Sequence, residues 1–238
     1  LFFAVEGWNV RYEELGGPDS MGSIGPEWAS VSNAPFRLYK FSSGDGGLRV
    51  PLVISGPGIA QTGHQAGLAH MADLMPTLLE AAGVTHDPQA YYGRSQMPAL
   101  RGETDAVRGP EDSIAVEVSG NVAVLRGDWK LTRVAEPFGD GTWQLYDMAT
   151  DPGEARDVAA AHPDIVDALK AEYAAYSAQV GVVELGPDES APKQLLRNLA
   201  RKSLALYWPL LVGLLAGLAG VVALAVWAVR ALRRPRAV

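Results

Sequence analysis

Four short runs of residues typical of strands, between positions 113 and 147, predict β-strands. The runs are Ser113–Val118, Asn121–Leu125, Trp129–Val134 and Trp143–Asp147. Gly120 and the pair Gly127-Asp128 separate the first three runs, and such residues are typical of the tight turns in hairpins. Because strands joined by short turns pair with each other, the pattern predicts a small antiparallel sheet.

The hydrophobic period changes to that of an α-helix over residues 163–178. Its apolar residues recur at intervals that place them on one face. They are Ile165, Leu169, Tyr173 and Tyr176. Pro163 suits the first helical position, and we expect the apolar face to pack on the small sheet. A shorter helix is expected to begin at Asp73, since Pro76 fits its first turn and Gly83 fits its end.

The first half of the chain gives weaker patterns. Residues 48–54 are mostly apolar, which predicts a strand with Pro51 near its start or at a sheet edge. Residues 1–5 predict another buried strand. Residues 6–35, rich in Gly, Pro, Ser and Asn, predict a long ordered loop. The chain opens on Leu1 without a Met or the charged start of a signal peptide, so we expect a fragment of a longer protein.

Residues 204–229 form a run of 26 residues without a charge. A helix of that length spans about 39 Å, more than the roughly 30 Å hydrocarbon core of a bilayer. Aromatic residues typical of membrane interfaces stand near its ends. They are Tyr207, Trp208 and Trp227. The run predicts one transmembrane helix in contact with the lipid bilayer, preceded by a linker over residues 184–203 and followed by a basic tail over residues 230–238.

Charge is distributed unevenly along the chain. Residues 1–191 hold 12 basic and 27 acidic residues, whereas residues 192–238 hold 8 basic residues and no acidic one. An acidic body does not suit a nucleic-acid-binding protein, which presents a basic face, so we expect no nucleic-acid partner. A basic segment beside an apolar one suits a membrane surface. The absence of cysteine excludes disulfides and cysteine nucleophiles from these residues.

The orientation in the membrane depends on the basic residues that flank the span. Four precede it and four follow it, so their number does not decide the orientation. The downstream group is denser, which favours a cytoplasmic C-terminus and an extracytoplasmic body. The alternative is a cytoplasmic body held by a C-terminal anchor.

Six motifs, in order along the chain, carry a family resemblance. They are Gly25–Ala29, Ala34–Lys40, Gly46–Pro51, Asp73–Leu79, Gly127–Leu131 and Leu145–Glu154. With this order and spacing, residues 6–180 resemble the C-terminal part of the sulfatase family, of the arylsulfatase type within the alkaline-phosphatase-like superfamily. The resemblance implies a membrane-anchored arylsulfatase-like enzyme that hydrolyses sulfuric esters, and its substrate would be a sulfate ester of a small molecule or a glycan.

The same resemblance implies an α/β fold and a division into domains. Residues 1–110 would form the end of the sulfatase catalytic domain, with the last strands of its large mixed sheet. Residues 111–183 would form the C-terminal subdomain, in which a helix packs on a small antiparallel sheet. The linker, a transmembrane helix over residues 204–229 and the basic tail would complete the chain.

Sulfatases use a formylglycine nucleophile, a divalent cation that is usually calcium, and basic side chains on the sulfate. The lysine of the family's "YK" segment contacts the sulfate ester, and it corresponds here to Lys40. The resemblance therefore implies a catalytic and substrate-binding role for Lys40. Its compact ammonium group, with several donors, suits a tetrahedral sulfate. The alternative is a surface lysine in a loop.

The other two parts of that chemistry are missing from the sequence. Formylglycine arises from Cys or Ser in a C/S-x-P-x-R motif, and Asn33–Arg37 has this spacing with an Asn that cannot be converted. The family's metal-binding Asp-Asn pair would fall between Phe3 and Glu6, where neither residue is present. Calcium is thus expected by resemblance alone, with no metal ligand in this chain, and we expect the isolated chain to be inactive.

The remaining polar residues suggest structural roles. Gly46-Gly47 predicts a turn with positive φ, and Arg49 is expected to pair with Asp45. The four histidines show no metal-ligand spacing, which favours surface or capping roles. They are His64, His70, His86 and His162. A solvated turn is preferred over a calcium site for three acidic residues that lack the EF-hand pattern. They are Asp147, Asp151 and Glu154.

Two other functions remain open. One is that of a non-catalytic, sulfatase-like membrane protein that binds anionic ligands, and the other is that of a related phosphoester hydrolase or transferase. The identity of the ester is open as well, among phenolic, steroid and glycan sulfates.

Overall fold

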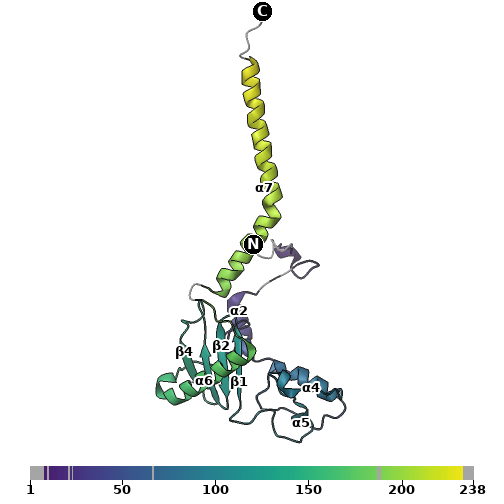
Figure 1. Ribbon diagram of the computed structural model, residues 1–238, viewed down its shortest axis with the longest axis vertical. Helices are drawn as coiled ribbons and strands as arrows, with labels where there is room; N and C mark the ends of the chain where they lie inside the picture. Colours follow the sequence, from purple (N-terminus) through teal and green to yellow (C-terminus); the bar gives the residue numbers. More distant parts are fainter. Residues whose placement is uncertain are drawn as a thin grey trace, which may run out of the picture. The chain divides into compact units, whose positions relative to one another are not determined.

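The computed structural model describes residues 8–9, 11–20, 22, 24–65, 67–186 and 189–232. The chain divides into two compact units, Ile24–Ser190 and the combination of Leu1–Ser23 with Ala191–Val238 (Figure 1). The predicted strand over residues 1–5 lies outside the described residues.

The centre of the first unit is a four-stranded sheet in which every neighbouring pair is antiparallel. Its strands follow the chain in the order β1, β2, β3, β4, and are Ser113–Val118, Asn121–Arg126, Trp129–Arg133 and Trp143–Asp147. Val118 faces Asn121 across the first turn. Ser119 and Gly120 in that turn have φ of 55° and 84°, as a two-residue hairpin turn requires. The predicted meander is confirmed.

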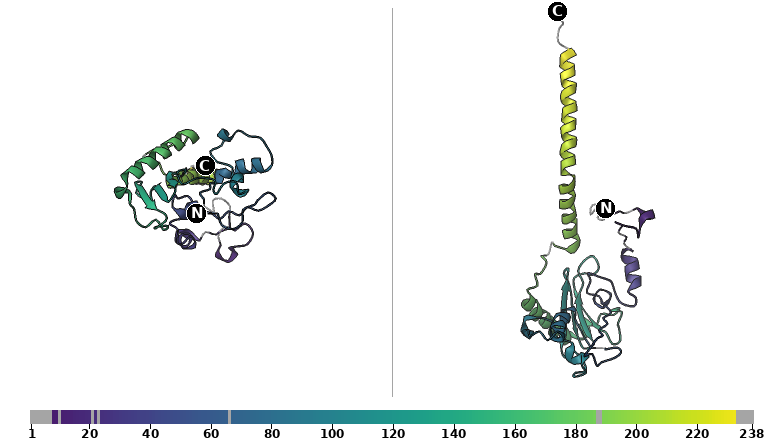
Figure 2. Two further views of the ribbon diagram at one scale, coloured as in Figure 1. Left: turned by 90° about the horizontal axis from the view of Figure 1, so that it is seen from below. Right: turned by 90° about the vertical axis from the view of Figure 1, so that its right-hand side faces the viewer.

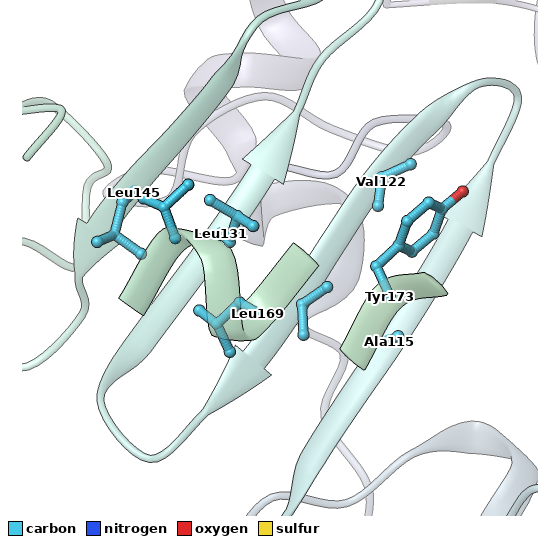
Figure 3. Close-up of a cluster of buried hydrophobic side chains, with 8 residues drawn as sticks. Ala115, Val122, Leu131, Leu145, Leu169 and Tyr173 are labelled. Carbon is cyan, nitrogen blue, oxygen red and sulfur yellow. The ribbon is translucent and has the colours of Figure 1, made fainter. Parts of the chain in front are cut away.

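One face of the sheet is covered by α6, Pro163–Val180. Figure 3 shows this helix crossing the strands, with Leu169 in the same buried cluster as Leu131 and Leu145. These three leucines are fully buried, and burying each contributes about 1.5–3 kcal/mol. Tyr173 closes one end of the same cluster. The predicted helix and its packing on the sheet are therefore confirmed.

The opposite face of the sheet is polar and buried. Successive side chains of a strand point to opposite faces, so Lys130 and Thr132 lie on the side of the sheet away from Leu131. Both are fully buried, and the Thr132 hydroxyl lies 2.7 Å from the hydroxyl of Ser43. The segment that contains Ser43 thus covers this face, and β3 is buried on both sides.

The rest of the described chain contains short helices joined by loops. They are η1 Tyr12–Glu14, α2 Gly25–Ser32, α3 Asp45–Leu48, η2 Met71–Asp73, α4 Leu74–Ala81, η3 Pro88–Ala90, α5 Met97–Leu100 and η4 Ala159–Ala161. The helix expected from Asp73 is confirmed as α4, with Pro76 in its first turn and Gly83 at φ 68° beyond its end. Figure 2 shows the ribbon in two further views.

Two expectations for the first half of the chain are wrong. The long loop over residues 6–35 contains a helix, α2, which starts with a proline in its first positions, where a missing N–H costs nothing. Residues 48–54 form no strand. Val50, Leu52 and Val53 are exposed, and an apolar segment forms a strand only where another strand accepts its hydrogen bonds.

The second unit contains α7, Ala191–Leu232, a helix of 42 residues that is about 63 Å long. It includes the predicted span over residues 204–229. Within its described residues Pro192–Trp227, an 18-residue stretch has a mean hydropathy of 2.5 and exposed side chains, so the helix is long and apolar enough to cross a membrane. Because α7 begins at Ala191, residues 191–203 of the predicted linker are helical. The end of the basic tail, residues 233–238, lies outside the described residues.

Candidate functional site

Lys40 lies at the exposed tip of a tight turn between α2 and α3. Leu38 and Phe41 on either side of it have φ of 63° and 68°. Bulky residues rarely adopt this left-handed conformation, and each instance costs on the order of 1–3 kcal/mol. The Lys40 Nζ lies 5.6 Å from the centroid of the Phe41 ring. Strain of this kind gathers at functional sites, so the turn is the first candidate for one.

Hydrogen bonds from within the segment hold the Lys40 turn. The Asn33 side-chain amide donates to the carbonyls of Leu38, at 3.2 Å, and Gly46, at 3.1 Å. The Ser42 hydroxyl donates to the carbonyl of Tyr39 at 2.7 Å. Asn33, which occupies the nucleophile position in the spacing of the C/S-x-P-x-R motif, therefore braces the turn that presents Lys40.

Gly46 and Gly47 allow α3 to approach this turn closely. A Cβ on Gly46 would lie 2.1 Å from the carbonyl oxygen of Leu38, and one on Gly47 would lie 2.6 Å from that of Tyr39. The prediction of positive φ for this pair is wrong, because both glycines are part of the helical turn of α3 and have no positive φ. The lack of a side chain, and not backbone freedom, is what this position requires.

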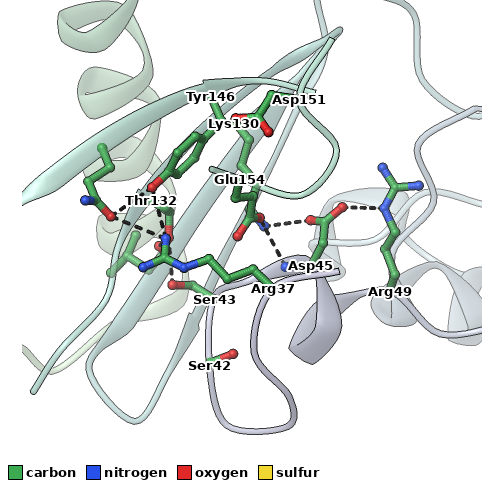
Figure 4. Close-up of polar contacts among 12 residues, drawn as sticks. Arg37, Ser42, Ser43, Asp45, Arg49, Lys130, Thr132, Tyr146, Asp151 and Glu154 are labelled. Atoms are coloured by element: carbon green, nitrogen blue, oxygen red, sulfur yellow. Dashed lines mark hydrogen bonds and ion pairs between the residues drawn. The ribbon is translucent and has the colours of Figure 1, made fainter. Parts of the chain in front are cut away.

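A buried ionic cluster forms the base of the turn (Figure 4). The Lys130 ammonium donates to Asp45 Oδ1 at 2.6 Å and also to Glu154 Oε1. Arg49 binds the second oxygen of Asp45, which confirms the expected pair. Glu154 Oε1 also accepts from the backbone N–H of Asp45 at 3.1 Å. Burial raises the pKa of Glu154, although the nearby Lys130 charge opposes this shift.

The prediction of a solvated turn for the three acidic residues near 150 is wrong for Glu154. Only 3% of Glu154 is exposed, and its φ of 55° turns the chain inward. Asp147 and Asp151 do act as turn residues, since both accept backbone N–H groups nearby. The pKa of Asp151 is lowered by the N–H groups of Arg156 and Ala155. Sequence reasoning missed Glu154 because its partner Lys130 is 24 residues away.

Arg37, which precedes the Lys40 turn, attaches the start of that turn to strand β4 of the sheet. Its guanidinium donates to the Tyr146 hydroxyl at 2.9 Å and to Gln144 Oε1 at 3.4 Å, and Figure 4 shows it directed at this group. The pKa of the Tyr146 hydroxyl is raised by burial, against the influence of the Arg37 charge. Arg37 and the Lys130 cluster together attach both ends of the Lys40 turn to one rigid sheet.

A second buried ion pair lies beneath α4. Asp73 accepts two hydrogen bonds from the Arg108 guanidinium, at 2.5 and 2.7 Å, and further ones from the backbone N–H groups of His70 and Arg94. Burial alone would raise the pKa of Asp73. The hydrogen bonds from Arg108 and from the two backbone N–H groups outweigh this effect, and the net shift of the pKa is downward. The pair holds three separate segments and was not foreseen, because its members are 35 residues apart.

The described residues do not fit a divalent cation. Within them, no three His, Asp or Glu side chains converge as a metal site would require. The carboxylates of Asp45 and Glu154 already bind Lys130. The capping role expected for histidine is confirmed at His70, whose Nδ1 accepts the N–H of Ala72 at 3.1 Å. The calcium expectation thus rests on the family alone.

Comparison with known proteins identifies the class. Residues 40–179, more than half of the chain, match the family model described as N-sulphoglucosamine sulphohydrolase, C-terminal. The chain therefore belongs to the sulfatase family and corresponds to the C-terminal part of its members. The matched range begins at Lys40 itself.

Curated relatives agree with this assignment. An uncharacterized sulfatase of Schizosaccharomyces pombe is 32% identical over 193 residues, which are 78% of this chain and 35% of that protein. Arylsulfatase of Klebsiella aerogenes is 44% identical over 75 residues, 31% of this chain and 16% of the relative. Arylsulfatase K of Xenopus laevis is 31% identical over 147 residues, 56% of this chain and 26% of the relative. The chain thus spans about a third or less of these proteins.

Solved structures confirm the sulfatase fold. Ps i-CgsB in complex with k-i-k-neocarrahexaose has a TM-score of 0.54 at 21% identity, covering 72% of this chain and 37% of the other. A protein from a glycosaminoglycan-metabolism locus of Bacteroides thetaiotaomicron has a TM-score of 0.51 at 23% identity, covering 58% and 31%. At these identities the likeness establishes the fold. The expected α/β C-terminal part of a sulfatase, with its small antiparallel sheet, is confirmed.

Proposed function

We propose that this chain is the C-terminal part of a membrane-anchored sulfuric ester hydrolase, in which Lys40 contacts the sulfate group. The observation that carries this proposal is the strained turn that presents Lys40. Leu38 and Phe41 adopt left-handed conformations that ordinary packing does not favour. The base of the turn is rigid, because the buried Lys130 cluster and the glycines of α3 fix its position.

The charge of Lys40 is available for an anionic ligand. The cations of Lys130 and Arg108 are buried against carboxylates, whereas the ammonium of Lys40 is exposed beside an aromatic ring. A positioned cation stabilises negative charge that develops in a transition state. Lys40 would bind a sulfate oxygen and favour departure of the alcohol or phenol. The described residues contain neither a formylglycine nor a cluster of side chains that could hold calcium.

The substrate class follows from the same site and from the fold neighbours. A single lysine that presents several donors suits a tetrahedral sulfate monoester. Ps i-CgsB was solved with a neocarrahexaose oligosaccharide, which supports a glycan as the carrier of the ester. A small-molecule sulfate is the other candidate.

The membrane part of the proposal rests on α7. Its apolar side chains are exposed along its length, Leu210, Leu214 and Leu218 among them. In water such a surface is unfavourable, whereas in a bilayer it meets hydrocarbon. We therefore propose that α7 crosses the bilayer, with residues 1–191 outside the cytoplasm and residues 230–238 inside.

The test is sulfate release from 4-nitrophenyl sulfate, with 4-nitrophenyl phosphate as the competing substrate. The complete protein that carries this chain should hydrolyse the sulfate ester, whereas the purified 238-residue chain should not. Preferential hydrolysis of the phosphate ester would favour the phosphoester alternative. A complete protein that binds sulfate esters without turnover would support the non-catalytic alternative and overturn the proposal.

A further inference from the structure

A small hollow is lined in part by the Lys40 side chain. Its volume is about 120 Å³, and it is lined by Leu38, Tyr39, Lys40, Phe41, Ser42 and Phe138. Five of these residues belong to the Lys40 turn, whereas Phe138 comes from the connection between β3 and β4. Two segments almost 100 residues apart thus place a cation and three aromatic rings around one space.

The aromatic rings have a defined arrangement. Tyr39 and Phe138 meet edge to face, with ring centroids 5.8 Å apart, which is a favourable geometry for such a pair. Phe41 is 67% exposed and Phe138 is 51% exposed. Each ring therefore retains surface that an apolar partner can cover.

The backbone at Phe41 adds a second observation. Its φ of 68° suits glycine or asparagine and disfavours a bulky side chain. The conformation costs energy, and the ring that it presents remains largely exposed to water, which adds no stability. Binding of a ligand to the Phe41 ring would account for both the strained backbone and the exposed aromatic side chain.

The size of the hollow limits that ligand. A cavity of about 150 Å³ holds one benzene molecule, so about 120 Å³ at an open surface accepts one six-membered ring. Because Lys40 is among the lining residues and is exposed, a ring with an anionic group next to it would gain an attraction that a neutral ring lacks. Both features are combined in a sulfate ester whose oxygen is bonded directly to a ring.

We propose that Phe41 and Phe138 form a recognition platform for the ring that carries the sulfate ester bound by Lys40. The platform rests on the proposed function and adds a specificity to it. Ring sulfates are bound through the sulfate and the ring, whereas an open-chain sulfate is bound through the sulfate alone. Aryl and pyranose rings both offer an apolar face, and the experiment separates them.

The test measures binding to the full 238-residue chain in detergent micelles by calorimetric titration. The probes are phenyl sulfate, glucose 3-sulfate and ethyl sulfate. Phe138→Leu, and Phe41→Asn, which tolerates the positive φ, should each weaken binding of at least one ring sulfate about fivefold to tenfold and leave ethyl sulfate unchanged. The ring sulfate that responds identifies the ring class. Trp28→Leu, which alters an exposed aromatic residue on α2, should change nothing.

The outcomes distinguish the two proposals. Lys40→Gln should weaken the binding of all three probes. If Lys40→Gln binds every probe as the parent chain does, the proposed role of Lys40 is overturned. If Lys40→Gln weakens all probes but the phenylalanine variants do not discriminate ring from open-chain sulfates, the platform is wrong and the Lys40 role stands. Near-ultraviolet circular dichroism of each variant must match the parent chain. If Phe138→Leu does not fold, Phe41→Asn alone tests whether a ring sulfate loses affinity. Phe138→Tyr, which keeps an aromatic ring, must then bind every probe like the parent chain.

Discussion

Replacing Lys130 with methionine tests whether the ionic cluster supports the fold. The change keeps a long side chain but removes the cation that both Asp45 and Glu154 bind. All three residues are essentially inaccessible to water, and removing one partner of a buried ion pair costs about 3–5 kcal/mol. Arg49 still binds Asp45, and Glu154 can take up a proton, so the loss should stay within that range despite the two orphaned carboxylates.

The measurement is urea unfolding of the full chain in micelles, followed by near-ultraviolet circular dichroism. Lys170→Met on α6, where the lysine is partly buried, is the matched control and should cost less than about 1 kcal/mol. Burial raises the pKa of Glu154 and Lys130 opposes this shift, so the pKa should rise further in Lys130→Met. The loss should therefore be smaller at pH 5, where Glu154 in the variant can take up a proton, than at pH 8, where its unpaired buried charge destabilises the fold. A loss below about 1 kcal/mol at pH 8 would refute the reasoning.

Two further predictions concern acid stability and topology. Asp73 has a lowered pKa in the folded state, chiefly because the Arg108 hydrogen bond overcomes the effect of burial. The stability that the Asp73 carboxylate contributes to the fold is therefore present above its unfolded-state pKa of about 3.9. It is lost as the pH falls through the lower pKa of Asp73 in the folded state. Unfolding measured between pH 2 and 6 should show this loss in the parent chain and a flatter profile in Asp73→Asn; equal slopes would contradict it. A reporter that is active only in the cytoplasm, fused after Val238, should be active in intact cells; an inactive reporter together with protease-resistant residues 1–191 would reverse the topology.

Local periodicity explains why the sheet and α6 were predictable. The strand-forming runs and turn residues from Ser113 to Asp147, and the helical spacing from Ile165 to Tyr176, are both set by neighbouring residues. The segment over residues 48–54 has equally apolar composition, yet it forms no strand. Strand formation depends on a partner elsewhere, which sequence composition does not reveal.

The candidate site was predictable only in part. Lys40 was found through the family motif, and the pairing of Arg49 with Asp45 was expected and is present. The left-handed conformations at Leu38 and Phe41 were not foreseen, because neither residue type signals positive φ. The Lys130 cluster was missed because Asp45 is 85 residues away from Lys130. One signal was present: a lysine at the second position of a strand, facing away from the leucine that enters the core.

The central claim is that Lys40 contacts the sulfate ester, and kcat is the most direct measure of it. In the complete protein that carries this chain, Lys40→Ala should lower kcat for 4-nitrophenyl sulfate about 100-fold or more, as removal of a group that stabilises transition-state charge does. Urea stability should change by less than about 0.5 kcal/mol, because Lys40 is exposed. Lys170→Ala is the control and should retain the parent kcat. A Lys40→Ala protein with the parent kcat would contradict the account.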